Sequence, residues 1–168
     1  AVTAFLFRGM LGFPLGELDA FLPPRDYGKA GIMEFQSDGS AEAGSEAWLS
    51  SLEEGLREAN RLGKPVFLDF TGYTCTNCRW MEANVFPRPE IRKLFKEFVL
   101  VRLYTDGAEP EHEENRRLES ERFGTIALPF YAVLSSDDRI LGTFPGLTRN
   151  PGEFAGFLTE SLKAAGRN

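Results

Sequence analysis

A short apolar run that leads directly into a Cys-x-x-Cys motif constrains this chain more than any other feature. Residues 66–70, Val-Phe-Leu-Asp-Phe, have the β-branched and aromatic character of a strand buried on both faces. Gly72 marks a turn, and Cys75 and Cys78 fit the first turn of a helix that ends at the proline-rich stretch 86–89. The sequence therefore predicts two sulfur atoms one helical turn apart, at the end of a buried strand.

The start of a helix gives Cys75 a physical reason to react. Free amide groups and the positive end of the helix dipole favour a thiolate there. The dipole contributes only about 0.3–1 kcal/mol, so neighbouring groups must supply any larger effect. Arg79 is the nearest cation in the sequence, whereas an ionised Asp69 buried in the strand would favour the thiol. The sequence does not rank these two opposing neighbours.

The rest of the chain supplies the elements of an α/β fold. The strand at 66–70 and a strand at 99–104 flank helical patterns, which predicts a parallel pair with a right-handed crossover. The order of all the predicted strands and helices favours a mixed sheet with helices on both faces, although other βαβ arrangements stay open. The expected helices are 45–62 (capped by Ser45, with Trp48 and Leu49 on its apolar face), 75–85, 89–98, 109–122 and 150–162, and the further strands are 130–134 and 139–144.

The N-terminal part differs from the rest. Residues 1–24 are apolar but too short and too interrupted by charges, glycines and prolines to cross a bilayer, and residues 25–44 have the composition of a linker or a surface loop. We therefore expect an arm over residues 1–44, either a juxtamembrane remnant or an arm packed on the domain, and one domain over residues 45–168. The chain begins with Ala and shows no leader pattern, so we expect a mature or truncated chain.

Charge and cysteine content exclude several functions. A formal charge of -6, a pI near 5.0 and the lack of a basic run argue against nucleic acid or an anionic membrane as a partner. Both cysteines lie in the one motif, so no structural disulfide framework is expected. The single histidine, His112, lies in the charged segment 109–122, where we expect a surface residue without a metal or catalytic role.

Three features together resemble the thioredoxin superfamily. They are the spacing from Asp69 to Cys75, the Cys75-Thr-Asn-Cys78 motif on a strand-to-helix turn, and Leu128-Pro129 ahead of a second strand. Within that superfamily, residues 64–82 are most similar to the C-terminal, periplasmic thioredoxin-like domain of DsbD-type thiol:disulfide interchange proteins. The resemblance spans roughly residues 45–165 and implies an α/β thioredoxin fold, a central mixed β-sheet with helices on both faces, with an extra N-terminal helix and an extended N-terminal arm.

The resemblance also implies roles for individual residues. Cys75 would attack a substrate disulfide, and Cys78 would resolve the mixed disulfide by closing the 75–78 bridge. Asp69, buried below the motif, would accept or return the proton of Cys78. Pro129 is the family's cis-proline position, where a cis bond would expose the backbone of Leu128 to an extended substrate segment.

The motif departs from its relatives at the residues around the cysteines. Thr76-Asn77 replaces the Gly-Pro that thioredoxins have between the two cysteines. Neither residue is the histidine that oxidising or isomerising relatives have between theirs. The first helical turn is therefore less rigid, and the thiolate lacks one source of support, which favours a reductant or electron relay over a strong oxidant. Tyr73-Thr74 replaces the tryptophan that usually precedes the first cysteine, on the surface expected to face the substrate.

The expected function is that of a protein-disulfide reductase. A monomer in the periplasm, or a domain of a membrane-anchored protein there, would receive electrons from a membrane-embedded donor domain and pass them to exported protein disulfides, as in electron transport for cytochrome c biogenesis. The redox-active disulfide would be the sole cofactor, with no metal and with protein thiols and disulfides as partners. A disulfide oxidase or isomerase, a copper module that uses both thiolates, and a partner-binding scaffold stay open as alternatives.

Overall fold

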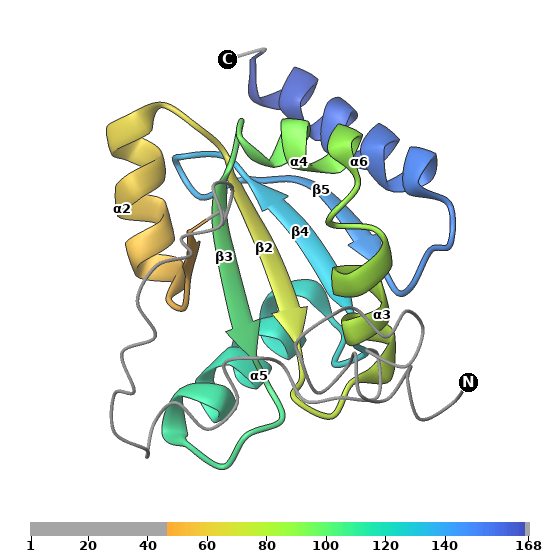
Figure 1. Ribbon diagram of the computed structural model, residues 1–168. Coiled ribbons are helices and arrows are strands. Elements are labelled where there is room, and N and C mark those ends of the chain that lie inside the picture. The colour runs from red at the N-terminus through yellow and green to blue at the C-terminus, as the bar shows by residue number, and fades with distance from the viewer. Residues whose placement is uncertain (1–46, 167–168) are drawn as a thin grey trace, which may run out of the picture.

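The computed structural model describes residues 47–166, which form one mixed sheet with helices on both faces (Figure 1). The strand order is β1-β3-β2-β4-β5, in which β1, β2 and β3 pair in parallel while β4 and β5 run antiparallel to their neighbours. The predicted thioredoxin-type fold is therefore confirmed. The elements are β1 (Trp48–Leu49), α2 (Leu52–Leu62), β2 (Val66–Thr71), α3 (Thr76–Asn84), α4 (Pro89–Phe95), β3 (Val99–Tyr104), α5 (Pro110–Phe123), β4 (Phe130–Leu134), β5 (Ile140–Pro145) and α6 (Pro151–Ala165).

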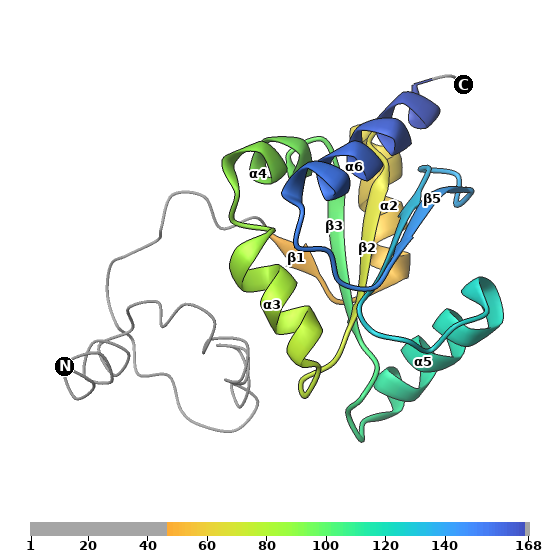
Figure 2. The ribbon, with the colours of Figure 1, turned by 90° about the vertical axis from the view of Figure 1, so that its right-hand side faces the viewer.

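The central strand β2 divides the core into two layers. All six of its side chains are buried, as predicted for a strand covered on both faces. Helices α3, α4 and α6 cover one face of the sheet, and α2 and α5 cover the other (Figure 2). Phe67 packs in the core layer under the first three helices, whereas Leu68 packs in the layer under α2 and α5. The ring of Phe67 lies 5.0–6.3 Å from the rings of Trp48, Phe86, Phe95, Phe98, Tyr131 and Phe154.

The first helix begins later than predicted. Trp48 and Leu49, expected on a helical face, instead form the short strand β1, which pairs in parallel with β3. Helix α2 begins at Leu52, because the Ser51 side chain accepts the Glu54 N–H at 3.4 Å and caps it. Hydrophobic periodicity does not reveal a two-residue pairing at a sheet edge. The proposed cap Ser45 and the arm 1–44 lie outside the described residues.

The charged segment 109–122 forms helix α5, but the helix is not wholly solvated. Glu119 is 0% exposed and His112 is 5% exposed, so the prediction of a surface histidine is wrong. The reason is long-range packing, because the imidazole lies against the ring of Tyr73, 39 positions earlier in the chain. Within residues 47–166 no helix has the length and apolarity that a bilayer crossing needs.

Candidate active site

The two cysteines lie one turn apart at the N-terminus of α3, where they form a disulfide. Cys75 is the N-cap of the helix, and its Sγ atom accepts the Cys78 N–H at 3.2 Å. Cys75 is partly exposed, whereas Cys78 is only 1% exposed. Cys75 is therefore the more accessible residue of the pair, and this is the asymmetry that a nucleophilic and a resolving cysteine require.

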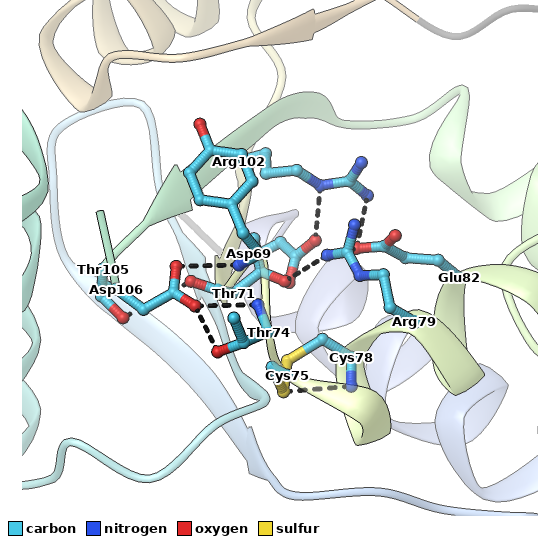
Figure 3. The surroundings of a disulfide bond; sticks show 11 residues. Asp69, Thr71, Thr74, Cys75, Cys78, Arg79, Glu82, Arg102, Thr105 and Asp106 are labelled. Atoms are coloured by element: carbon cyan, nitrogen blue, oxygen red, sulfur yellow. Dashed lines mark hydrogen bonds and ion pairs between the residues drawn. A yellow bond between two sulfur atoms is a disulfide. The ribbon is translucent and has the colours of Figure 1, made fainter. Parts of the chain in front are cut away.

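The loop before Cys75 is held by Asp106, which was not among the predicted site residues. Its Oδ1 atom accepts the Tyr73 N–H at 2.8 Å, and its Oδ2 atom accepts the Thr74 N–H and hydroxyl, both at 2.9 Å (Figure 3). Partial burial opposes ionisation of this carboxyl, but the hydrogen bonds from Thr74 and Tyr73 outweigh it and lower the pKa of Asp106. A Cβ atom at Gly72 would lie 2.8 Å from Oδ2, so a larger residue here would displace the carboxylate that holds the loop.

A network of four charged side chains lies beside the disulfide, on the α3 face of the sheet (Figure 3). Asp69 is 1% exposed and accepts a hydrogen bond from Nε of Arg102, its cross-strand partner in β3, at 2.9 Å. Arg102 also lies 3.6 Å from Glu82, which pairs with Arg79 at 2.6 Å. Nη2 of Arg79 additionally donates to Thr71 at 2.8 Å. The charge of Arg79 therefore belongs to this carboxylate network.

Burial dominates the ionisation of Asp69. Desolvation raises the pKa of Asp69, and the charges of Arg102 and Arg79 offset this only in part. The Trp48 ring covers the Arg102 guanidinium at 4.2 Å, so the aromatic face shields that ion pair from water. A buried carboxyl whose pKa is raised suits the transfer of a proton near neutral pH. The predicted proton transfer between Asp69 and Cys78 itself stays a prediction.

The loop before β4 brings a backbone segment to the same end of the sheet. The Leu128–Pro129 peptide is cis, as predicted, and the C=O of Pro129 accepts the Gly146 N–H at 2.8 Å. A Cβ atom at Gly72 would lie 3.1 Å from Cδ1 of Leu128, so this side chain borders the turn that leads to Cys75. Among the described residues, no backbone hydrogen bond engages the N–H or the C=O of Leu128.

The structure thus gathers most of the predicted site residues at one end of the sheet. Tyr73 and Thr74 precede the disulfide, Leu128 flanks the same turn, and Thr76 and Asn77 are exposed in the first turn of α3. The sequence did not identify four further residues as part of the site: Glu82, Arg102, Asp106 and Trp48. Two signals for them existed, because Arg102 is the only charged residue in its predicted strand, and Asp106 follows the end of that strand. In the part of the chain that the structure describes, no three His, Cys, Asp or Glu side chains gather in a possible metal site.

Comparison with known proteins supports the fold. Residues 47–136 match the family model described as thioredoxin-like. A thioredoxin from Thermus thermophilus superposes with a TM-score of 0.61 at 24% identity, over 73% of this chain and 91% of that one. The DsbH oxidoreductase gives 0.59 at 16% identity, over 80% and 96% of the two chains. The C-terminal domain of Neisseria meningitidis DsbD in its oxidised form gives 0.55 at 21% identity, over 68% and 99%.

These likenesses concern the fold, and the chemistry comes from this chain's own cysteines. No curated protein matches the chain in sequence. A thioredoxin-like fold that carries a Cys-x-x-Cys disulfide at a helix start is the arrangement of a thiol:disulfide oxidoreductase. Because the thioredoxin-like model covers residues 47–136 of 168, more than half of the sequence, the chain belongs to the thioredoxin-like family.

Proposed function

We propose that this chain is a protein-disulfide reductase that relays two electrons through the Cys75–Cys78 couple to disulfides of exported proteins. The observation that carries the proposal is the unequal exposure of the two cysteines, because Cys75 is partly exposed at the helix start while Cys78 is buried. A membrane-embedded donor domain, an extracytoplasmic location and a place in cytochrome c biogenesis rest on the resemblance to DsbD-type proteins.

The reaction proceeds in two balanced exchanges. The Cys75 thiolate attacks a substrate disulfide, forms an S–S bond to one substrate sulfur and releases the other as a thiolate that takes up a proton. Cys78 then loses its proton to Asp69 and attacks Sγ of Cys75, which closes the 75–78 disulfide and releases the second substrate thiolate. Two electrons pass from the cysteine pair to the substrate. A donor dithiol restores the pair by the reverse sequence.

Leu128 supports the docking of an extended substrate segment. Its N–H and C=O are not engaged by the backbone of the described chain, and its side chain borders the turn before Cys75. An extended peptide can therefore add a short strand there, with its disulfide directed at Cys75. Tyr73 and Thr74 form the adjoining surface, held in place by Asp106.

The composition of the motif favours reduction over oxidation. No cation lies between the cysteines, and Thr76-Asn77 provides neither the proline of thioredoxins nor the histidine of oxidising relatives. A thiolate with few local cations is less stabilised, so the reduced pair gives up its electrons more readily. A disulfide oxidase or isomerase is the competing assignment.

The reduction potential of the couple separates these assignments. The purified chain is equilibrated with defined thiol buffers, and its free thiols are counted after alkylation. We expect a reversible two-electron couple near the potential of reducing thioredoxins, about -270 mV. A value of about -120 mV, as in a strong oxidant, would indicate electron flow in the opposite direction. The absence of any reversible couple would remove the redox assignment.

Trapping experiments test the roles of the two sulfurs. Cys78→Ser should accumulate a mixed disulfide through Cys75, because the resolving thiol is missing. Cys75→Ser should not, because its remaining sulfur is 1% exposed. Trapping by the second variant instead of the first would exchange the two roles.

A further inference from the structure

The imidazole of His112 lies against the loop that precedes the reactive cysteine. Its ring centroid is 5.6 Å from that of Tyr73 at an interplanar angle of 77°, an edge-to-face contact. The Tyr73 ring in turn stacks on Tyr104 of β3 at 4.0 Å and 9°. The first turn of α5 therefore packs on the aromatic pair that joins this loop to β3.

The same imidazole fills the space beside the turn that carries Asp106. A Cβ atom at Gly107 would lie 1.8 Å from Nδ1 and 2.3 Å from Cε1 of His112, so the ring occupies the place of a side chain at position 107. Asp106, the preceding residue, accepts the hydrogen bonds from Tyr73 and Thr74. His112 thus contacts both partners of this connection, the ring of Tyr73 and the turn that carries the accepting carboxylate.

Two carboxylates lie near the ring nitrogens. Nδ1 lies 2.9 Å from a carboxylate oxygen of Glu109, an ion-pair distance, although it makes no hydrogen bond within the described residues. Nε2 is 3.6 Å from a carboxylate oxygen of Glu111. Backbone and amide contacts hold the surrounding turn, because the His112 N–H donates to the Glu109 C=O at 3.0 Å and Asn115 donates to the Tyr104 C=O at 2.9 Å.

We propose that His112 is a positioning residue for the nucleophilic sulfur of Cys75. The ring is a wedge between the Asp106–Gly107 turn and Tyr73, and it fixes the two residues that directly precede the helix cap. With that loop fixed, Sγ of Cys75 stays at the helix start, 3.2 Å from the Cys78 N–H. The inference rests on the proposed oxidoreductase function, because it assigns His112 a part in the reactivity of the same sulfur.

Removal of the wedge should reduce the thiolate at Cys75. The loop would gain room to relax, and the sulfur would spend less time against the free amides of the helix start. Those interactions are worth about tenfold in the thiolate population, which is equivalent to about 1.4 kcal/mol. A histidine that served only the stability of α5 would leave this population unchanged.

The experiment measures the alkylation of Cys75 by iodoacetamide in the reduced protein as a function of pH, with the modified site identified by mass spectrometry. We expect the midpoint for His112→Ala to move to higher pH and its rate at pH 7 to fall about tenfold. His112→Phe keeps a ring edge against Tyr73, so its rate should stay within about twofold of the parent chain. Leu118→Ala is the matched control, because this half-buried residue of α5 packs in the core layer under α2 and α5, on the other side of the sheet from α3.

Three results would overturn the positioning role of His112. They are a folded His112→Ala variant with the pH profile of the parent chain, an equal shift in Leu118→Ala, and a His112→Phe variant that reacts as slowly as the alanine variant. If the alanine variant does not fold, His112→Asn takes its place, since it removes the ring but keeps a polar side chain of similar width. A reversible couple in the parent chain with no effect of His112 defeats only this inference, whereas a parent chain without a couple defeats the proposed function.

Discussion

Two buried carboxyl groups, Asp69 in β2 and Glu119 in α5, have opposite surroundings. Both are nearly inaccessible, at 1% and 0% exposed, and burial raises the pKa of each, to about 7 for Glu119. Asp69 is paired with Arg102, whereas neither oxygen of Glu119 has a hydrogen-bond partner in the described part of the chain. The carboxyl beside the sulfurs is therefore balanced by cations that keep both of its protonation states accessible, while desolvation alone acts on Glu119.

The largest effect should come from removing the cation of the paired carboxyl. Arg102→Met leaves Asp69 buried without its hydrogen-bonded partner, which costs about 3–5 kcal/mol of unfolding free energy. Urea denaturation of the oxidised chain at pH 7 measures this loss. Arg57→Met is the control, because the ion pairs of Arg57 with Glu53 and Glu54 are exposed and contribute about 0–1 kcal/mol. A loss below about 1 kcal/mol for Arg102→Met would mean that the pairing does not offset the burial of Asp69.

The unpaired carboxyl should show itself as a pH dependence of stability. Folded Glu119 keeps its proton up to about pH 7, whereas an ordinary glutamate releases it near 4.5, so the folded state binds more protons in this window. Stability therefore falls as the pH rises from about 4.5 to 7, by about 3 kcal/mol in total. Glu119→Gln should remove this slope, as followed by urea denaturation between pH 4 and 8.

Glu121→Gln is the control for that slope. Glu121 lies on the same helix but is 72% exposed, with a side-chain contact of 4.0 Å to Arg117, so its removal should leave the pH dependence intact. If Glu119→Gln kept the parent slope, another group would be responsible for it, and the contrast between the two buried carboxyls would disappear.

Local patterns predicted the elements that depend on local rules. Strands 99–104 and 130–134 have the predicted bounds, because continuous apolar runs of that length suit a buried sheet. The last helix begins at its predicted Asn150 cap, whose side chain accepts the Gly152 N–H at 3.0 Å. The two-residue strand β1 escaped prediction, because the pairing of Trp48 with β3 is a long-range contact that no local pattern encodes.

The site was predictable where it follows the chain and not where it depends on packing across the fold. The order strand, turn, helix predicted Cys75 at the start of a helix, and the apolar strand around Asp69 predicted its burial. His112 was misjudged because a charged neighbourhood in sequence is typical of a solvated helix, while its actual neighbours come from other elements. Only the register of β2 against β3 places Arg102 opposite Asp69, and no local sequence pattern encodes that register.

A kinetic effect should come from Asp69 itself. Asp69→Asn removes the proposed proton acceptor of Cys78, so we expect disulfide exchange near neutral pH to slow about 10²-fold, equivalent to about 2.7 kcal/mol, with little change in reduction potential. Stopped-flow reduction of a model disulfide measures the rate. Since a protonated carboxyl cannot accept a proton, the advantage of the parent chain is present at higher pH and is lost as the pH falls through the raised pKa of Asp69. Unchanged rates throughout would remove Asp69 from the mechanism.

The smallest effect should come from Asp106, the exposed carboxylate that holds the loop before Cys75. Asp106→Asn keeps an accepting oxygen but loses the charge that strengthens three hydrogen bonds. We therefore expect the hydrogen bonds that hold the loop to weaken by about 1 kcal/mol in total, and the rate of disulfide exchange to fall about fivefold. The same stopped-flow assay measures it, with Asp137→Asn as the control for an exposed carboxylate far from the sulfurs in sequence.

The pKa of Asp106 is lowered whereas that of Asp69 is raised, so the effects of the two carboxyls depend on pH in different ranges. The carboxylate is ionised above its ordinary value near 3.8, so its hydrogen bonds contribute fully through neutral pH and are lost only as the pH falls through the lowered pKa. Asp106→Asn should therefore slow exchange by the same factor from pH 5 to pH 8, whereas the defect of Asp69→Asn should shrink toward acid pH. Parallel profiles for the two variants would show that loop position and proton transfer are one effect, because both substitutions would then act through the same step.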